Sequence, residues 1–155
     1  MELFDVYPLY DITPEKGDGC YVYDESGRKY LDLYGGHAVI SIGHAHPNYV
    51  QAIQTQVAKL GFYSNSIKNP LQNELACKLE EISGIRDYAL FLCSSGAEAN
   101  ENALKVASFH TGKDRIIYFE NAFHGRTSGV VAITDNETIK APFNKGHKAT
   151  RLAFN

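Results

Sequence analysis

Apolar residues return at helical spacing in two stretches of the chain. The first follows Pro47 and ends at Gly61, and the second follows Pro70 and ends at Gly84. The apolar positions are Val50, Ile53, Val57 and Leu60, and then Leu71, Leu75, Leu79 and Ile82. Each set lies on one face of a helix. Proline is favoured in a first helical turn and glycine just after a last one, so helices are predicted over 47–60 and 70–83.

Farther along, apolar runs alternate with another helical pattern. An apolar run at 88–92 leads into small residues, a helical pattern covers 97–110 and stops at Gly112, and a second apolar run covers 115–120. We expect strands at 88–93 and 115–120, and the start of a further strand at 150–155. This order predicts an α/β fold with an at least partly parallel sheet, in which ligands bind at the carboxyl ends of strands.

The beginning of the chain has the pattern of an arm followed by a hairpin. Residues 20–23 and 29–33 are rich in tyrosine and aliphatic side chains, and they flank the turn-forming tetrad Asp24-Glu25-Ser26-Gly27. Such a tetrad between two short strand-like runs predicts a β-hairpin.

Candidate chemistry begins where the run 88–92 ends. The segment Ser95-Gly96-Ala97 has the composition of a tight turn into a helix, and Ser95 with Glu98 fits a capping box. Free backbone N–H groups at a helix start bind phosphate, and glycine lets an anion approach closely. Spacing alone leaves open an ordinary capped strand-to-helix turn.

A second candidate loop follows the run 115–120. It contains Phe123, His124, Gly125 and Arg126. Taken alone, Phe123 could be a core residue and Arg126 a surface charge. An arginine just past a tight glycine is also well placed for bidentate recognition of a carboxylate. Together with the first loop, this predicts a phosphorylated, planar, ring-bearing cofactor.

Composition narrows the function classes. The 155 residues carry a net charge of −3 with both signs interspersed, which argues against a nucleic-acid or membrane surface. The N-terminus lacks the features of a secretory signal, and no stretch approaches the apolar length of a membrane span. Three widely spaced cysteines, Cys20, Cys77 and Cys93, favour a reducing cytoplasm over a disulfide framework.

Four segments carry a resemblance to a known family. They are Tyr30-Leu31-Asp32, Gly43-His44-Ala45-His46-Pro47, Ser95-Gly96-Ala97-Glu98-Ala99-Asn100-Glu101 and Phe123-His124-Gly125-Arg126-Thr127. In this order and spacing, essentially the whole chain resembles the N-terminal part of class III, ornithine-type, pyridoxal-phosphate aminotransferases. The resemblance implies the fold-type I, aspartate-aminotransferase-like architecture, here a partial, mostly parallel sheet with flanking helices. It also implies pyridoxal 5′-phosphate as cofactor and a homodimer.

The same resemblance implies a division into domains. Residues 1–45 would form an arm and the hairpin segment of the small domain. Residues 46–155 would form the beginning of the large cofactor-binding domain. Asn65 and Ser66 would lie in a segment near the dimer interface and active site.

Roles for individual residues also follow from the resemblance. The cofactor phosphate would be held by Ser95, Gly96 and Ala97. Phe123 would stack on the pyridine ring with His124 beside it, and Arg126 would bind the substrate carboxylate. Glu101 would contact these residues and hold them in place, without touching the cofactor itself. Pyridoxal phosphate acts as an electron sink, so the protein must anchor its phosphate, hold its ring plane and orient the substrate.

Members of this family need a Schiff-base lysine and an acidic partner for the pyridine nitrogen, both well downstream of the second loop. The lysines Lys105, Lys140, Lys145 and Lys148 lack the family context, so we assign no catalytic residue in this chain. We expect the chain to be the N-terminal part of a larger protein. On its own it should be inactive as a transaminase, and poorly ordered or prone to aggregate.

The histidines in the first half of the chain are predicted to have a structural role and not to bind metal. His44 and His46 stand at a spacing that can ligate metal, but no further ligand cluster is evident, so we predict no metal site. The favoured interpretation is a segment that shapes a turn and caps a helix. His37 follows Gly35-Gly36 where many relatives carry an aliphatic residue, which leaves the acyl substrate open between acetyl and succinyl.

Within the family, the resemblance is strongest to members that act on acylated ornithine. It implies transfer of the terminal amine of an N2-acyl-ornithine (acetyl or succinyl) to 2-oxoglutarate, giving the semialdehyde and glutamate, in arginine biosynthesis. Its partners would be these small molecules and a second copy of itself, with no nucleic acid or membrane. The alternatives are an ω-aminotransferase for ornithine or 4-aminobutyrate, and a non-catalytic binding or dimerisation fragment. A nucleotide-phosphate binder is disfavoured because both common glycine-rich nucleotide motifs are absent.

Overall fold

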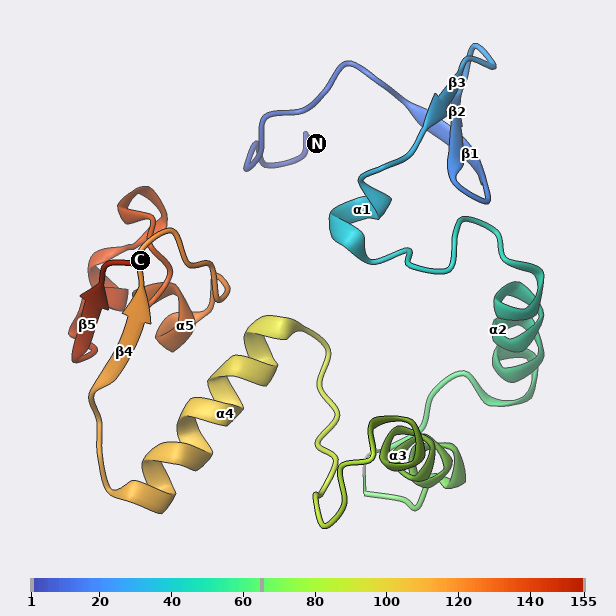
Figure 1. Ribbon diagram of the computed structural model, residues 1–155. Coiled ribbons are helices and arrows are strands. Elements are labelled where there is room, and N and C mark those ends of the chain that lie inside the picture. Colours follow the sequence, from blue (N-terminus) through green and yellow to red (C-terminus); the bar gives the residue numbers. More distant parts are fainter. Residues whose placement is uncertain (1, 65, 155) are drawn as a thin grey trace. The chain divides into compact units, whose positions relative to one another are not determined.

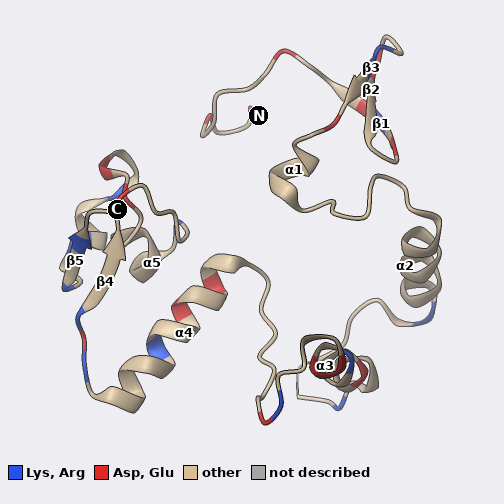
Figure 2. Cartoon of the chain, viewed as in Figure 1, with Lys and Arg blue, Asp and Glu red and all other residues tan. Residues whose placement is uncertain are grey.

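The computed structural model describes residues 2–64 and 66–154 (Figure 1). The chain divides into two compact units, Met1–Asn69 and Pro70–Asn155. No helix among the described residues is both long and apolar enough to cross a membrane. Acidic and basic residues are interspersed along the chain in both units (Figure 2).

The first unit contains the predicted hairpin and one strand more. Strands β1 (Pro14–Asp18), β2 (Tyr21–Asp24) and β3 (Lys29–Leu31) form an antiparallel sheet in that order. The turn is held by Asp24, whose carboxylate accepts hydrogen bonds from Ser26, Arg28 and Tyr30. These bonds, the Ser26 hydroxyl first, lower the pKa of Asp24 to about 2. Strand β1 was not predicted, because its sequence PEKGD has neither apolar alternation nor β-branched residues.

The histidine segment fastens the end of this sheet. The Nε2 atom of His44 lies 2.6 Å from a carboxylate oxygen of Asp32, and the backbone of His44 exchanges two hydrogen bonds with Gly19. His46 is the N-cap residue of α2, although its side chain makes no capping hydrogen bond. The segment therefore shapes a turn and precedes a helix. His44 fastens the turn to the sheet, and His46 stands at the start of α2.

Two helices complete the first unit. The short turn α1 (Gly35–Ala38) contains Gly36 and His37 at positive φ, and the Nδ1 atom of His37 lies 2.6 Å from the Tyr34 hydroxyl. Helix α2 (Pro47–Leu60) has the predicted bounds, with proline in its first turn. The predicted helix over 47–60 is confirmed.

The second unit holds the elements of the predicted α/β pattern. Helices α3 (Pro70–Ser83) and α4 (Gly96–Thr111) are followed by β4 (Ile116–Phe119), α5 (Ser128–Ala132), the short 3-10 helices η1 (Glu137–Ile139) and η2 (Pro142–Gly146), and β5 (Ala149–Leu152). Strands β4 and β5 pair in parallel, and their arrows point the same way in Figure 1. Helix α4 ends at Gly112, which adopts the left-handed conformation (φ 67°) that glycine tolerates.

The strand predicted over 88–93 is wrong. That segment has no strand structure, and neither β4 nor β5 pairs with it. A strand is stabilised by ladder hydrogen bonds to a neighbour, which an apolar run cannot supply by itself. Within the described residues the parallel pair is β4 and β5, and α5 lies between them in sequence.

The most deeply buried segment of the second unit is α5 and the residues just after it. Val130 and Val131 are at most 1% exposed, and Ile133 and Thr134 are similarly buried. Tyr118 of β4 and Asn144 of η2 complete this small core. The segment was not predicted as a helix, since five residues are too few for a helical period to show. It nevertheless lies at the centre of the unit that carries the predicted site.

Candidate functional site

The N-terminus of α4 is built as the sequence predicts, with one difference. Ser95 is the N-cap residue in extended conformation, and its Oγ accepts a hydrogen bond from the Glu98 N–H at 3.2 Å. The Glu98 carboxylate accepts from the Ser94 N–H at 2.7 Å, one residue before the N-cap. The reciprocal bond of the capping box is therefore displaced by one residue, and the helix start remains fixed.

This helix start leaves donors open for an anion. Among the described residues, the N–H groups of Gly96 and Ala97 have no hydrogen-bond acceptor. A Cβ placed on Gly96 would meet no atom within 4 Å, so the space in front of this turn is open. Two unpaired N–H groups at the positive end of a helix, beside the Ser94 and Ser95 hydroxyls, fit an anionic phosphate.

The second predicted loop contacts this turn directly. It follows the carboxyl end of β4, and within it Gly125 is buried with φ 135°. A Cβ on Gly125 would lie 2.7 Å from the Ala97 Cβ and 2.8 Å from the Val130 Cγ2. Glycine is therefore required for both conformation and space. The close approach brings the predicted phosphate loop and the predicted ring-binding loop together.

One face of α4 holds the chain that follows this contact. Asn100 Nδ2 donates to the His124 carbonyl at 3.0 Å. An oxygen of the Glu101 carboxylate accepts from the Thr127 hydroxyl at 2.8 Å, the Gly129 N–H at 2.8 Å and the Val130 N–H at 3.2 Å. Ala97, Asn100 and Glu101 are three and four residues apart, so they share a helix face. Glu101 thus supplies the acceptor for the N-terminus of α5.

The environment of Glu101 keeps it ionised. Burial alone would raise its pKa, but the hydrogen bonds from Thr127, Val130 and Gly129 outweigh that effect and lower it. Hydrogen bonds that favour the charged form of a carboxyl are a general cause of such a shift.

The remaining predicted site residues lie on the same loop. Phe123 is 66% exposed, and Arg126 is exposed beside the buried Gly125. His124 is half-buried, and its backbone is bonded on both sides, through its carbonyl to Asn100 and through its N–H to Thr134. The aromatic ring and the guanidinium therefore flank a rigidly held backbone. Ser66 lies in the first unit, and Asn65 lies outside the described residues.

Sequence reasoning missed two residues that hold this site. Asn100 stands within the recognised motif, but only its bond to the distant His124 carbonyl shows what it does. Thr134 follows an apolar run after Arg126, and no spacing or motif in the sequence distinguishes it. Its buried hydroxyl contacts the loop across ten residues of sequence.

A cavity of about 720 Å³ in this unit lies elsewhere. It runs beside α4 from Glu101 to Thr111 and is bounded by residues 113–117 and by His147. Of the predicted site residues it includes Glu101 only. We place the candidate site at the N-terminus of α4 instead, because the open N–H donors and the close contact between the two predicted loops are there.

Comparison with known proteins agrees with the motifs. The family model described as aminotransferase class-III matches residues 5–153. The chain belongs to the class-III aminotransferase family. An acetylornithine aminotransferase of Archaeoglobus fulgidus is 43% identical over 141 residues, which are 91% of this chain and 37% of that protein. One of Halalkalibacterium halodurans is also 43% identical, over 91% of this chain and 36% of that protein.

Solved structures show the same class-III fold. The ornithine aminotransferase of Toxoplasma gondii superposes with a TM-score of 0.85 at 23% identity, over 95% of this chain and 37% of that one. The ω-transaminase of Pseudomonas jessenii, solved in complex with PMP, gives 0.81 at 23% identity, over 96% and 37%. The predicted fold-type I α/β architecture is confirmed. This class-III chain spans little more than a third of these relatives.

The Gly125 contact generates a stability prediction. We expect Gly125→Ala to destabilise the full-length class-III protein by about 2–4 kcal/mol, because its Cβ would overlap Ala97 and Val130 and φ is positive. Thermal and urea unfolding would measure the change. Gly146→Ala is the matched control, since a Cβ there meets nothing within 4 Å. Equal stability of the two variants would contradict the close contact.

Glu101 generates a pH prediction. Its folded-state pKa is below the ordinary value of 4.5, so its stabilisation is present above that value and is lost as the pH falls through the folded-state pKa. We expect Glu101→Gln to be less stable than wild type at pH 7 by about 1 kcal/mol, with a smaller loss of stability on acidification. Unfolding measured from pH 7 to pH 3 tests this. Glu74→Gln, on α3, should follow wild type throughout.

Proposed function

We propose that the protein containing this chain is a pyridoxal-phosphate-dependent aminotransferase of N2-acyl-ornithine. It would transfer the terminal amine to 2-oxoglutarate, giving the semialdehyde and glutamate, and so serve arginine biosynthesis in the cytoplasm as a homodimer. The family and the PMP complex of a neighbouring structure indicate the cofactor. The acylornithine substrate is supported by relatives named acetylornithine aminotransferase at 41–43% identity.

The observation that carries the proposal is the contact of Ala97 with Gly125. It joins a helix terminus with open donors to a loop that offers an aromatic ring and a guanidinium. An anion, a flat ring and a substrate carboxylate need these three groups within one small region. Residues 1–45 as part of a small domain and 46–155 as the start of a large one complete the proposal.

The residues fit the cofactor and divide its binding between them. Gly96 and Ala97 would donate backbone N–H groups to the phosphate, and the Ser95 hydroxyl would contribute beside them. Phe123 would cover one face of the ring with His124 next to it, and Arg126 would orient the substrate by its carboxylate. When bound, pyridoxal phosphate supplies an electron sink for the carbon that loses a proton.

We assign the proton-transferring lysine to none of the lysines in this chain. Lys140, the most buried of them, is already occupied: its Nζ bonds Glu137 at 2.7 Å, and its side chain is 6% exposed. Burial alone would lower the pKa of Lys140, but Glu137 and Tyr118 outweigh burial and raise it. A lysine with a raised pKa stays protonated and is a poor general base. We therefore propose that the 155 residues alone do not transaminate.

A kinetic test addresses Arg126. In the full-length enzyme we expect Arg126→Ala to raise the KM for the acylornithine or 2-oxoglutarate roughly 10–100-fold, since a charge-assisted bidentate contact is lost. The absorbance of bound cofactor should be unchanged. Arg86→Ala, an exposed arginine in the same unit, is the control and should behave as wild type. An unaltered KM for both substrates in Arg126→Ala would remove this arginine from the site.

A substrate comparison tests the proposed specificity. We expect kcat/KM for N-acetyl- or N-succinyl-ornithine to exceed that for ornithine and 4-aminobutyrate by at least about tenfold, which corresponds to roughly 1.4 kcal/mol of binding to the acyl group. Rates with the four donors at saturating 2-oxoglutarate measure this. A preference for free ornithine or 4-aminobutyrate would support the other ω-aminotransferase alternatives. No reaction with any donor, despite bound cofactor, would support the non-catalytic alternative.

A further inference from the structure

The loop 121–125 must find its hydrogen bonds outside regular structure. Asn121 has φ 59° and Gly125 has φ 135°, so the loop follows neither a helix nor a strand. Two consecutive residues, Thr134 and Asp135, form hydrogen bonds with backbone groups of this loop. These residues belong to no motif that the proposed function uses. We propose that Thr134 and Asp135 are positioning residues that fix the direction of the Phe123 ring, an inference that rests on the proposed function.

Thr134 holds the loop on the C-terminal side of Phe123. The side chain is buried, with the residue 1% exposed. Its Oγ1 accepts a hydrogen bond from the His124 N–H at 2.9 Å. The same hydroxyl lies 3.1 Å from the Gly125 carbonyl and 3.0 Å from the Val130 carbonyl, to which it can donate its single proton. One hydroxyl therefore links the loop to α5.

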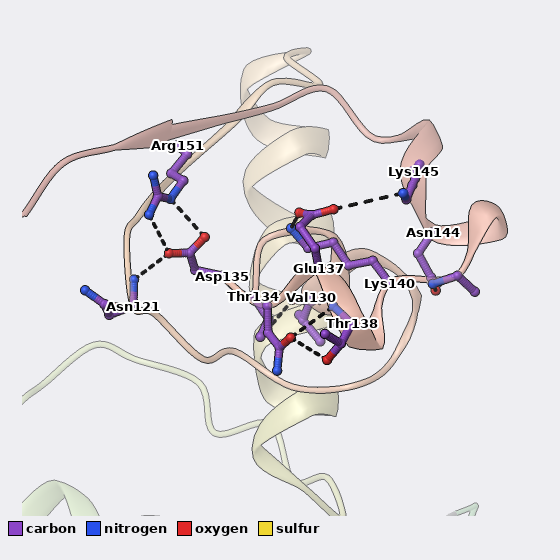
Figure 3. A network of polar contacts seen from close by, with 12 residues as sticks. Asn121, Val130, Thr134, Asp135, Glu137, Thr138, Lys140, Asn144, Lys145 and Arg151 are labelled. Atoms are coloured by element: carbon purple, nitrogen blue, oxygen red, sulfur yellow. Dashed lines mark hydrogen bonds and ion pairs between the residues drawn. The ribbon is translucent and has the colours of Figure 1, made fainter.

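Asp135 holds the loop on the N-terminal side of Phe123. Its backbone N–H donates to the Ala122 carbonyl at 2.8 Å. Its carboxylate accepts from the Asn121 N–H at 2.7 Å and pairs with Arg151 of β5 at 2.9 Å (Figure 3). The hydrogen bonds from Arg151 and Asn121 lower the pKa of Asp135, which keeps the carboxylate charged. Figure 3 shows the Asp135 carboxylate between these two partners.

The combined effect falls on Phe123. The peptide unit before it is fixed through the Ala122 carbonyl, and the peptide unit after it is fixed through the His124 N–H. Fixing both peptide planes fixes φ and ψ of the residue between them, and so the direction of its Cα–Cβ bond. Phe123 as a residue is 66% exposed, so packing within this chain does little to orient its ring. Its orientation depends on the backbone beneath it.

The test compares variants of the full-length protein loaded with pyridoxal phosphate. Thr134→Val keeps the shape of the side chain and removes the hydroxyl, and Thr134→Ser restores the hydroxyl. Thr138→Val is the matched control, because it removes a threonine hydroxyl that bonds only Asn136, away from the loop. The readouts are the Kd of the cofactor, its visible circular dichroism per molecule bound at saturation, and the melting temperature of the cofactor-free protein.

We expect Thr134→Val to raise the cofactor Kd about tenfold, because the half-buried His124 N–H loses its acceptor and the ring contact is misdirected. The dichroism per bound cofactor should change as well, while Thr134→Ser and Thr138→Val stay near wild type. A lower melting temperature with unchanged Kd and dichroism would show a merely structural role and overturn the proposal.

Asp135→Asn provides a second variant if Thr134→Val does not fold. It retains the backbone bond to Ala122 and an acceptor for Asn121, but it weakens the pairing with Arg151. We expect a smaller change in dichroism in the same direction, and a folded variant identical to wild type would also overturn the proposal. A wild-type protein that binds no pyridoxal phosphate overturns the proposed function itself. If the wild-type protein binds the cofactor and is active, but the variants have unchanged Kd and dichroism, this inference alone is overturned.

Discussion

The rest of the second unit depends on one interaction, the hydrogen bonding of the Glu101 carboxylate to the N-terminus of α5. The carboxylate is placed by α4 and accepts three hydrogen bonds from the 127–130 segment. That segment leads into the only strongly buried helix of the described residues. Because Ala97 lies one helical turn before Glu101, docking α5 on Glu101 also presses Gly125 against Ala97. The same face of α4 therefore contacts both the buried core segment and the loop of the candidate site.

Local signals were sufficient for the three long helices, α2, α3 and α4. Pro47, Pro70 and Gly112 mark helix ends through their own backbone preferences, and these preferences need no knowledge of distant residues. The cap at Ser95 is equally local, which is why the phosphate loop could be proposed from sequence. The family resemblance added the proposed roles of Phe123 and Arg126, which spacing alone left open.

Non-local pairing explains what sequence could not provide. The segment 88–93 has the composition of a strand, but pairing depends on a neighbour that its own residues do not specify. Strand β1 shows the reverse case, since polar residues pair there because β2 lies beside them. Thr134 is the clearest example within the site. A threonine in an apolar run is ordinary until the fold brings the His124 N–H within 2.9 Å of its hydroxyl.

The two helix starts on either side of the Gly125 contact have opposite electrostatic character. At α5, the N–H groups of Gly129 and Val130 are already satisfied by the negative charge of Glu101. At α4, the Glu98 carboxylate is bonded to Ser94, and within the described part of the chain the N–H groups of Gly96 and Ala97 keep no acceptor. An external anion gains hydrogen bonds at α4 and would have to displace a bound carboxylate at α5. Of these two helix starts, only the one at α4 therefore has N–H groups open to an external anion, which is why we propose it as the phosphate site.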